Sequence, residues 1–314
     1  MDGSMRSILL PTLPTARIHV LRVIVYAFVI LDILTLSGDV VAHAGNAEYY
    51  TPLLLARILH LPAVTSLVAQ LLRALIIVAC VAAVAGVTPR ITGAVVAIGY
   101  WVWMLYSQGY GYVAHDHMAL MVAVAVLPTV ATPPLFGDGG PAGSAAGRPA
   151  GSAADGSVGA GTVGEEPRSE AAGWALRCIQ IAVVATYFFS IVPKILYTGS
   201  FAAWANSAIL TWASLRRGSV LAHWLVENVP WIFVPAQWSG VALEALSPVV
   251  LFLRGRALYV AIALYISFHL ATLVLLGIHF LPTVICWAAF LPLERWRELG
   301  RGRRPRRQAA ESGV

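Results

Sequence analysis

Charged side chains are scarce in this sequence. Asp, Glu, Lys and Arg make up only 11% of its 314 residues, whereas hydrophobic residues make up 59%. A soluble domain carries about 25% charged residues, so the composition excludes an ordinary water-soluble globular protein and predicts an all-α integral membrane protein. The net charge is +6. The arginines lie in short loops and in a C-terminal tail, which favours contact with membrane lipid over nucleic acid.

Motifs for metals and nucleotides are also missing from the sequence. The three cysteines, Cys80, Cys178 and Cys286, lie in separate apolar runs without neighbours at metal or redox spacing, so we expect buried thiols. We find no zinc motif of the H-E-x-x-H type, phosphate loop, nucleophile elbow or dinucleotide fingerprint. We therefore expect no metal cofactor.

Lysine is almost absent. Lys194 is the single lysine among 21 lysines and arginines, and it follows an apolar run that begins at Trp174. An ammonium group in a membrane-length helix costs about 2.5–3.5 kcal/mol, so it usually has a partner or a function. Unlike arginine, a desolvated lysine loses its proton readily and can act as a base.

Apolar runs of membrane-spanning length predict about eight transmembrane helices. The segments 52–60 and 197–230 are shorter or more polar, and we expect them to lie at the membrane interface. The predicted spans are 18–38, 66–87, 91–107, 116–134, 174–196, 231–253, 257–276 and 280–293.

The sequence between the fourth and fifth spans has a different composition. Residues 137–173 are rich in Gly, Ala, Ser and Pro, and they predict a disordered linker between two groups of four helices, 1–136 and 174–295. A basic tail, 296–314, ends the chain. The arginine distribution predicts a multi-pass protein of the cell (plasma) membrane with both termini and the linker in the cytoplasm. The alternative for the first span is a signal peptide cleaved after Ala42-His43-Ala44.

This topology places ionisable residues from four helices in the outer half of the bilayer. They are Lys194, His115, His269 and Asp32, and they predict a polar pocket that opens to the outer face.

Each of these residues also has a structural interpretation. Asp32 could pair with Arg22 or Arg73, and Lys194 could extend its amine to the interface. Glu244 could likewise pair with Arg73, and we expect His117, like His223 and His279, to be interfacial.

Three separated motifs resemble one family. Tyr187-Phe188-Phe189 through Lys194, followed by Trp204, resembles the signature helix of the vitamin K-dependent gamma-carboxylase-like membrane domain, or HTTM domain. His115-Asp116 with Leu120 resembles its N-H-[DS]-x-L element, and Phe268-His269-Leu270 resembles its F-H-L segment. The motifs occur in the family's order and cover about residues 15–295. The chain is similar to short, bacterial-type members without a large extracytoplasmic domain.

The resemblance implies a function. It implies Lys194 as the base that deprotonates a lipid-soluble quinol, with His115 and His269 as hydrogen-bonding groups and a quinone or hydroquinone as cofactor. It also suggests contacts to substrate from Asp116, Tyr187, Trp204 and Asp32. The departures from the motifs are Pro193 in place of a second lysine, Ala114 in place of asparagine and Ser190 in place of glycine. Without the extracytoplasmic domain, we do not expect carboxylation of a protein substrate.

Two other functions stay open. The chain could be a non-catalytic permease or partner subunit of a membrane complex, which would tolerate replacement of Lys194 by methionine. It could also be a structural membrane anchor, and burial of the Lys194 amine would argue against that role.

Overall fold

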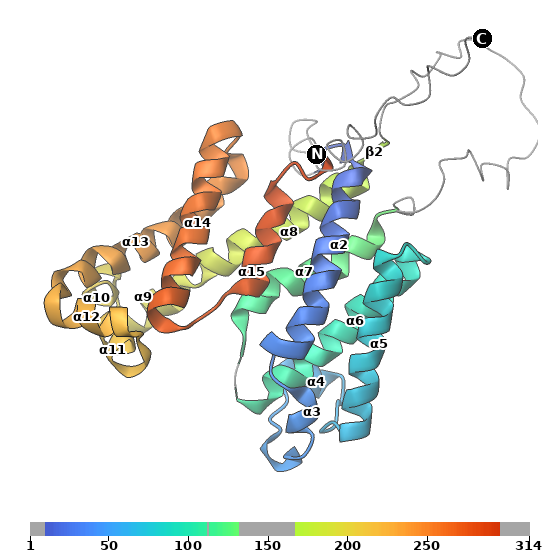
Figure 1. The fold of residues 1–314 in the computed structure, drawn as a ribbon, viewed down its shortest axis with the longest axis horizontal. Helices are drawn as coiled ribbons and strands as arrows, with labels where there is room; N and C mark the ends of the chain where they lie inside the picture. Colours follow the sequence, from blue (N-terminus) through green and yellow to red (C-terminus); the bar gives the residue numbers. More distant parts are fainter. Residues whose placement is uncertain (1–9, 112, 132–166, 296–314) are drawn as a thin grey trace, which may run out of the picture.

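A computed structural model describes residues 10–111, 113–131 and 167–295. These residues are mostly helical, as the composition predicts (Figure 1). Their strands are two short segments, β1 (Leu13–Pro14) and β2 (Arg168–Ser169), which pair antiparallel. The pairing joins the beginning of the chain to the segment before the fifth predicted span.

One hydrophobic core holds helices from both sides of the predicted linker. Its buried residues include Ile18 and Trp103 from the first group and Leu176 and Trp287 from the second. The two groups of helices therefore pack as one body around shared side chains. The core helices are α2 (Thr15–Leu31), α5 (Ser66–Val84), α6 (Pro89–Ser107), α7 (Met118–Val126), α8 (Glu170–Phe189) and α15 (Leu281–Cys286).

A second region extends from the far end of α8 (Figure 1). It contains the short helices expected in 197–230, and several of its tryptophans are exposed. Exposed tryptophans are typical of a membrane–water interface. The helices of this region are α9 (Ile191–Thr198), α10 (Phe201–Trp204), α11 (Ala208–Arg217), α12 (Val220–Asn228), α13 (Phe233–Leu246) and α14 (Gly255–Leu276).

Short elements connect and extend these helices. They are η1 (Asp32–Leu36), α3 (Val40–His43), η2 (Ala47–Tyr49), α4 (Leu54–Ile58), η3 (Gln108–Tyr110), η4 (His115–His117), η5 (Leu127–Thr129), η6 (Pro230–Ile232), η7 (Ser247–Phe252) and η8 (Trp287–Phe290).

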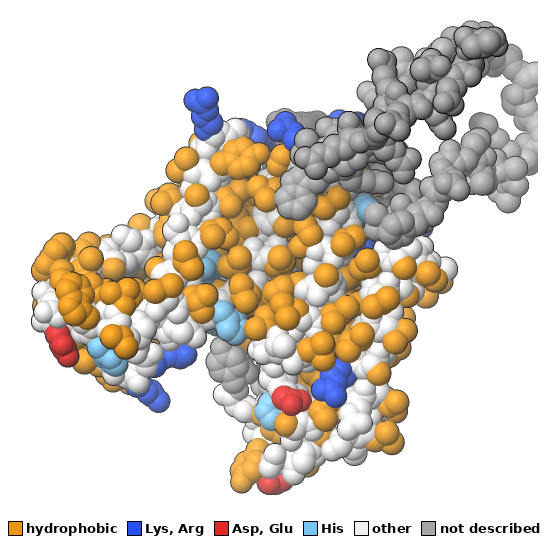
Figure 2. Space-filling model, viewed as in Figure 1, with side chains coloured by type: hydrophobic (Ala, Val, Ile, Leu, Met, Phe, Trp, Pro, Cys, Tyr) orange, Lys and Arg blue, Asp and Glu red, His pale blue; other side chains and the backbone are white. Residues whose placement is uncertain are grey.

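Four helices in the described part of the chain are long and apolar enough to cross a membrane. They cover Thr15–Leu36, Ser66–Val84, Glu170–Thr198 and Gly255–Leu276. Hydrophobic side chains cover most of the visible surface (Figure 2), as expected of a membrane protein. The helices at the other predicted spans are either too short or not apolar enough to meet the same criteria. The total of eight spans therefore stays a prediction.

One predicted boundary is wrong, and one predicted span is interrupted. Residues 170–173, assigned to the linker, form the first turn of α8, and the Ser169 hydroxyl caps this turn by accepting a hydrogen bond from the amide of Ala171. The fifth span is also divided at Ser190. Pro193 lacks an amide hydrogen for the carbonyl of Phe189, four residues earlier, which explains the break. Residues 137–166 of the linker and the tail 296–314 lie outside the described residues.

An ion pair joins the two ends of the described chain. The Arg17 guanidinium donates to both carboxylate oxygens of Glu294, at 2.7 and 2.6 Å. Burial is the largest single influence and raises the pKa of Glu294, but the hydrogen bonds from Arg17, a backbone hydrogen bond and the charges of Arg17 and Arg295 together lower that pKa below its usual range. The bond between α2 and the segment after η8 therefore persists as an ionised pair at neutral pH.

Gly173 provides a test of how closely the segment before β1 packs against α8. A Cβ at this position would lie 1.6 Å from the carbonyl oxygen of Pro11. Gly173→Ala should therefore force the two segments apart and lower the free energy of unfolding by about 1–3 kcal/mol. Gly240→Ala is the matched control, because its Cβ would lie at an ordinary 3.6 Å from Phe268. Thermal unfolding in detergent should show a lower melting temperature for Gly173→Ala than for Gly240→Ala. Equal stability of the two variants would contradict the observed packing.

Candidate functional site

Lys194 has a partner that the sequence analysis did not assign to it. Its ammonium donates a hydrogen bond to the carboxylate of Glu244, which projects from α13. The two side chains are only 16% and 11% exposed, so the amine does not extend freely into solvent. Glu244 therefore pairs with Lys194 rather than with Arg73, the alternative that the sequence had left open. A mostly buried lysine and glutamate stabilise each other's charges, since either charge alone would be costly to bury.

Trp204 lies against the same amine. The Lys194 Nζ atom is 5.5 Å from the centre of its indole ring, within the range of a cation–π contact. The side-chain amide of Gln237, on α13, donates to the Trp204 carbonyl at 2.6 Å and fixes the end of α10. Thus α13 supplies both the carboxylate for the lysine and the support for its aromatic neighbour.

Three cavities lie beside Glu244, and Lys194 lines two of them. The largest has a volume of about 470 Å³ and is lined by His115, Lys194, Trp204 and Glu244, with apolar walls from α8 and α9. A smaller cavity of about 80 Å³ extends toward His269, and another of about 220 Å³ extends between α11, α13 and α14. Glu244 lines all three. A ligand in any of them would therefore lie beside the same carboxylate.

His269 belongs to a buried hydrogen-bonded chain. The Tyr187 hydroxyl is hydrogen-bonded to the His269 Nε2 atom and accepts a hydrogen bond of 3.0 Å from the Trp287 indole. Because the hydroxyl oxygen already accepts from the indole, its own hydrogen is available for His269 Nε2, which accepts it in the tautomer that carries the proton on Nδ1. That nitrogen, Nδ1, is buried without a hydrogen-bond partner, and His269 lines the smallest cavity. His269 is thus a buried donor available to a ligand.

His115 lines two of the three cavities, one of which also contains Lys194. It lines both the large and the smallest cavity, and its ring centre is 6.2 Å from that of Phe280. It is exposed, in the short helix η4. The structure therefore brings four predicted site residues, Lys194, Trp204, His115 and His269, to connected cavities, with Tyr187 beside His269.

Asp32 and Asp116 lie in a separate buried cluster. His117 contacts Asp32 with one ring nitrogen at 3.0 Å and Asp116 with the other at 3.1 Å. Asp32 also accepts a hydrogen bond of 2.8 Å from the Tyr100 hydroxyl. These contacts fix η4 to the end of α2, so the cluster positions His115, which precedes Asp116 in the chain.

The position of His117 and the partners of Asp32 differ from those expected from the sequence. His117 is 3% exposed, so its predicted interfacial position is wrong. The alternative of an Asp32 ion pair with Arg22 or Arg73 is not what the structure shows, because the Asp32 carboxylate contacts His117 and Tyr100. The Arg22 guanidinium donates to the carbonyls of Leu127 and Val130. The sequence His115-Asp116-His117 does indicate that the two histidines have different surroundings, because residues two apart on a helix point in different directions.

Within the described residues, no group of three or more His, Cys, Asp or Glu side chains is arranged to hold a metal ion. A carboxylate–ammonium pair can exchange a proton with a ligand, and a buried histidine can donate a hydrogen bond to it.

No protein-family model, curated protein or solved structure matches this chain. The resemblance to the gamma-carboxylase-like membrane domain therefore stays a prediction from three motifs, and the function must be argued from the site.

Replacing Asp32 tests whether the cluster of Asp32, Asp116 and His117 stabilises the fold. Asp32→Ala leaves His117 and the Tyr100 hydroxyl without their acceptor in a fully buried environment, and should cost about 3–5 kcal/mol of unfolding free energy. Asp39→Ala is a control, since Asp39 caps the exposed helix α3 and its loss should cost about 1 kcal/mol. Chemical denaturation in detergent measures both. A cost no greater for Asp32→Ala than for Asp39→Ala would show that the cluster is not a stabilising element.

Proposed function

We propose that this chain is a membrane enzyme that binds a lipid-soluble quinol, or a lipid with a similar phenolic head, and deprotonates it at Lys194. The observation that carries the proposal is the Lys194–Glu244 ion pair, because both residues line two cavities and Glu244 also lines a third. A purely structural ion pair would not need a cavity beside it. An exchangeable proton next to a space for a ligand is what acid–base catalysis requires.

The size and lining of the largest cavity suit a ring with an apolar tail. Its volume of about 470 Å³ lies within the usual range for small-molecule sites, and Trp204 offers a flat surface beside the amine. On α9, Leu196 and Tyr197 are 76% and 87% exposed, so this side of the site faces outward with apolar groups. A lipid-soluble ligand could therefore reach the amine from the bilayer without crossing water.

The proton transfer uses the ion pair as a unit. The proton that makes Lys194 cationic moves to the Glu244 carboxylate, which leaves a neutral amine beside a neutral acid. The ligand's hydroxyl then gives its proton to the amine, and the resulting ammonium stabilises the ligand's phenolate oxygen. The Nδ1–H group of His269 is placed to donate to a second oxygen of the ligand from the smallest cavity.

A non-catalytic subunit is the second candidate, and one observation favours it. Glu244 compensates the charge of Lys194, which is also the usual arrangement for a structural pair in a membrane protein. In that case the cavities would be filled by lipid tails, and the pair would only hold α9 against α13.

The two candidates differ in what Lys194→Met does to binding of menadiol, a methylated naphthohydroquinone. For the enzyme, we expect the wild-type protein to bind anaerobic menadiol and to produce the absorbance of its phenolate. Lys194→Met should weaken binding by about ten- to hundredfold, the usual effect of losing a charged hydrogen bond, and should abolish the phenolate band.

Tyr197→Phe is the matched control for this experiment. It changes a side chain that lines the same cavity but leaves the ion pair intact, so it should bind menadiol and produce the phenolate band as the wild-type protein does. Absence of phenolate in the wild-type protein would reject the deprotonation, and equal menadiol binding by Lys194→Met would favour the non-catalytic subunit.

A further inference from the structure

The cavity between α11, α13 and α14 extends from the ion pair to a buried polar side chain that the proposed deprotonation does not use. It has a volume of about 220 Å³, and Lys194, Glu244 and Gln237 all line it. Gln237 and Glu244 are seven residues apart on α13, so they lie on the same face of that helix, about 10 Å apart along its axis. Gly240 lies between them and has no side chain to fill the space. The cavity therefore has polar groups at two separate positions along α13.

Gln237 offers the cavity a hydrogen-bond acceptor. Its side chain is 8% exposed, and its amide nitrogen donates to the Trp204 carbonyl at 2.6 Å. Because a carbonyl can only accept, this bond identifies the nitrogen and leaves the other amide atom, Oε1, as the acceptor. Among the described residues, Oε1 has no hydrogen-bond partner, although it is buried. A buried acceptor without a partner costs about 1–3 kcal/mol, so a ligand that donates to it would be favoured.

Thr272, on α14, limits the ligand in the same way. Its hydroxyl donates to the His269 carbonyl at 2.8 Å, so its hydrogen is engaged and its oxygen can only accept from a ligand. Thr272 and Gln237 both line the cavity. Two acceptors favour a ligand with a donor hydrogen, such as a hydroxyl, over an ether, an ester or a ketone.

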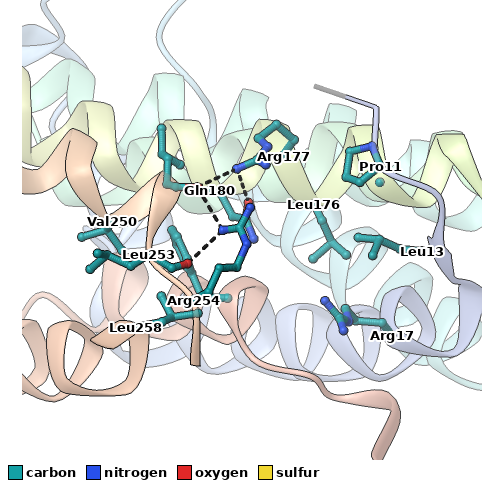
Figure 3. Close-up of a pocket in the computed structure, with 13 residues that line it drawn as sticks. Pro11, Leu13, Arg17, Leu176, Arg177, Gln180, Val250, Leu253, Arg254 and Leu258 are labelled. Atoms are coloured by element: carbon teal, nitrogen blue, oxygen red, sulfur yellow. Dashed lines mark hydrogen bonds between the residues drawn. The ribbon is translucent and has the colours of Figure 1, made fainter. Parts of the chain in front are cut away.

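The charge of this cavity differs from that of the cavity at the other end of α8. Arginines line that other cavity, where Arg177 and Arg254 both donate to the Leu251 carbonyl, at 3.5 and 3.3 Å (Figure 3). The charged side chains among the described lining of the cavity beside α13 are Lys194 and Glu244, which are paired with each other. An uncharged ligand suits such a lining, because a further charge would have no counter-charge left to bind.

Apolar groups around the cavity point to a lipid. Leu210, Val241 and Leu276 form part of its walls, one from each of the three helices. Ile209 also lines the cavity and is 38% exposed, so the cavity meets the surface at an apolar side chain. The volume is below the usual range for small-molecule sites, so the cavity would hold a small head and the first carbons of one chain.

We propose that this cavity binds the hydroxyl head of a neutral, single-chain lipid alcohol, with Gln237 Oε1 as the principal acceptor and the chain in contact with the apolar walls. Gln237 does not line the larger cavity that we assign to the quinol, so the two sites are distinct. The lipid alcohol would lie beside the same ion pair as the quinol, but its binding does not rest on the proposed deprotonation.

The single lysine reports on this cavity, because Lys194 lines it. In lipid nanodiscs, 1-dodecanol should shift the nitrogen-15 signal of the Lys194 ammonium saturably. Dodecyl methyl ether carries the same chain and oxygen without the donor hydrogen, and it should bind about tenfold more weakly, as expected when a buried acceptor stays unpartnered. Gln237→Leu removes the acceptor and should lower the affinity for dodecanol to that for the ether.

Ser239→Ala is the matched control. Ser239 is exposed on α13 and does not line the cavity, so this variant should keep the preference for dodecanol. Equal affinities of the wild-type protein for dodecanol and the ether would show partition into an apolar space only and overturn the site. A preference for dodecanol that persists in Gln237→Leu would overturn the role of Gln237. These titrations contain no quinol, so their outcome is independent of the proposed function.

Discussion

The hydrogen-bonded ion pair between Lys194 and Glu244 is the contact on which the candidate site depends. It joins α9 to α13 in a region where both helices expose apolar side chains, so it is one of few polar ties available there. Removing either partner would leave a largely buried charge. The same carboxylate lines three cavities, and therefore the ion pair determines both how this region packs and what a ligand would meet.

The site's two histidines are positioned by different means. His269 is oriented by the Tyr187 hydroxyl, which is in turn oriented by the Trp287 indole, so its ring is fixed from inside the core. His115 is exposed and depends on its neighbours in η4, which are held by the cluster of Asp32, His117 and Asp116. Thr283 adds a further tie, because its hydroxyl donates to the Asp116 carbonyl at 2.6 Å. Networks of this kind give a site a defined geometry within a largely apolar protein.

Much of this arrangement could be predicted from the sequence, because membrane-length apolar runs constrain where polar residues can lie. The scarcity of charge made Lys194 conspicuous, and its neighbourhood does include Trp204 and His115. Glu244 could not be assigned in advance, since it lies 50 residues from Lys194 and only the packing of α13 against α9 brings the two together. The break at Ser190 was foreseeable from Pro193, but a run of apolar residues on both sides concealed it.

The predictions that the structure contradicts share a physical cause. Periodicity gives the direction of a side chain around its own helix, but it does not say which neighbouring helix that side faces. His117 was therefore expected at the interface although it is enclosed between two aspartates, and Asp32 was expected in the pocket of Lys194 although it lies in the separate cluster with His117. The convergence of Arg177 and Arg254 is likewise invisible in the sequence, where 76 residues separate them: it requires the turn after η7 to return beside α8.

The single lysine makes the central claim directly measurable. Labelling lysine side chains with nitrogen-15 gives one ammonium signal from the whole chain, that of Lys194. If the ammonium is held by Glu244 beside a ligand cavity, this signal should shift in Glu244→Gln and should shift again when menadiol is added to the wild-type protein. A signal typical of a freely hydrated lysine, unchanged by Glu244→Gln and by menadiol, would contradict the account.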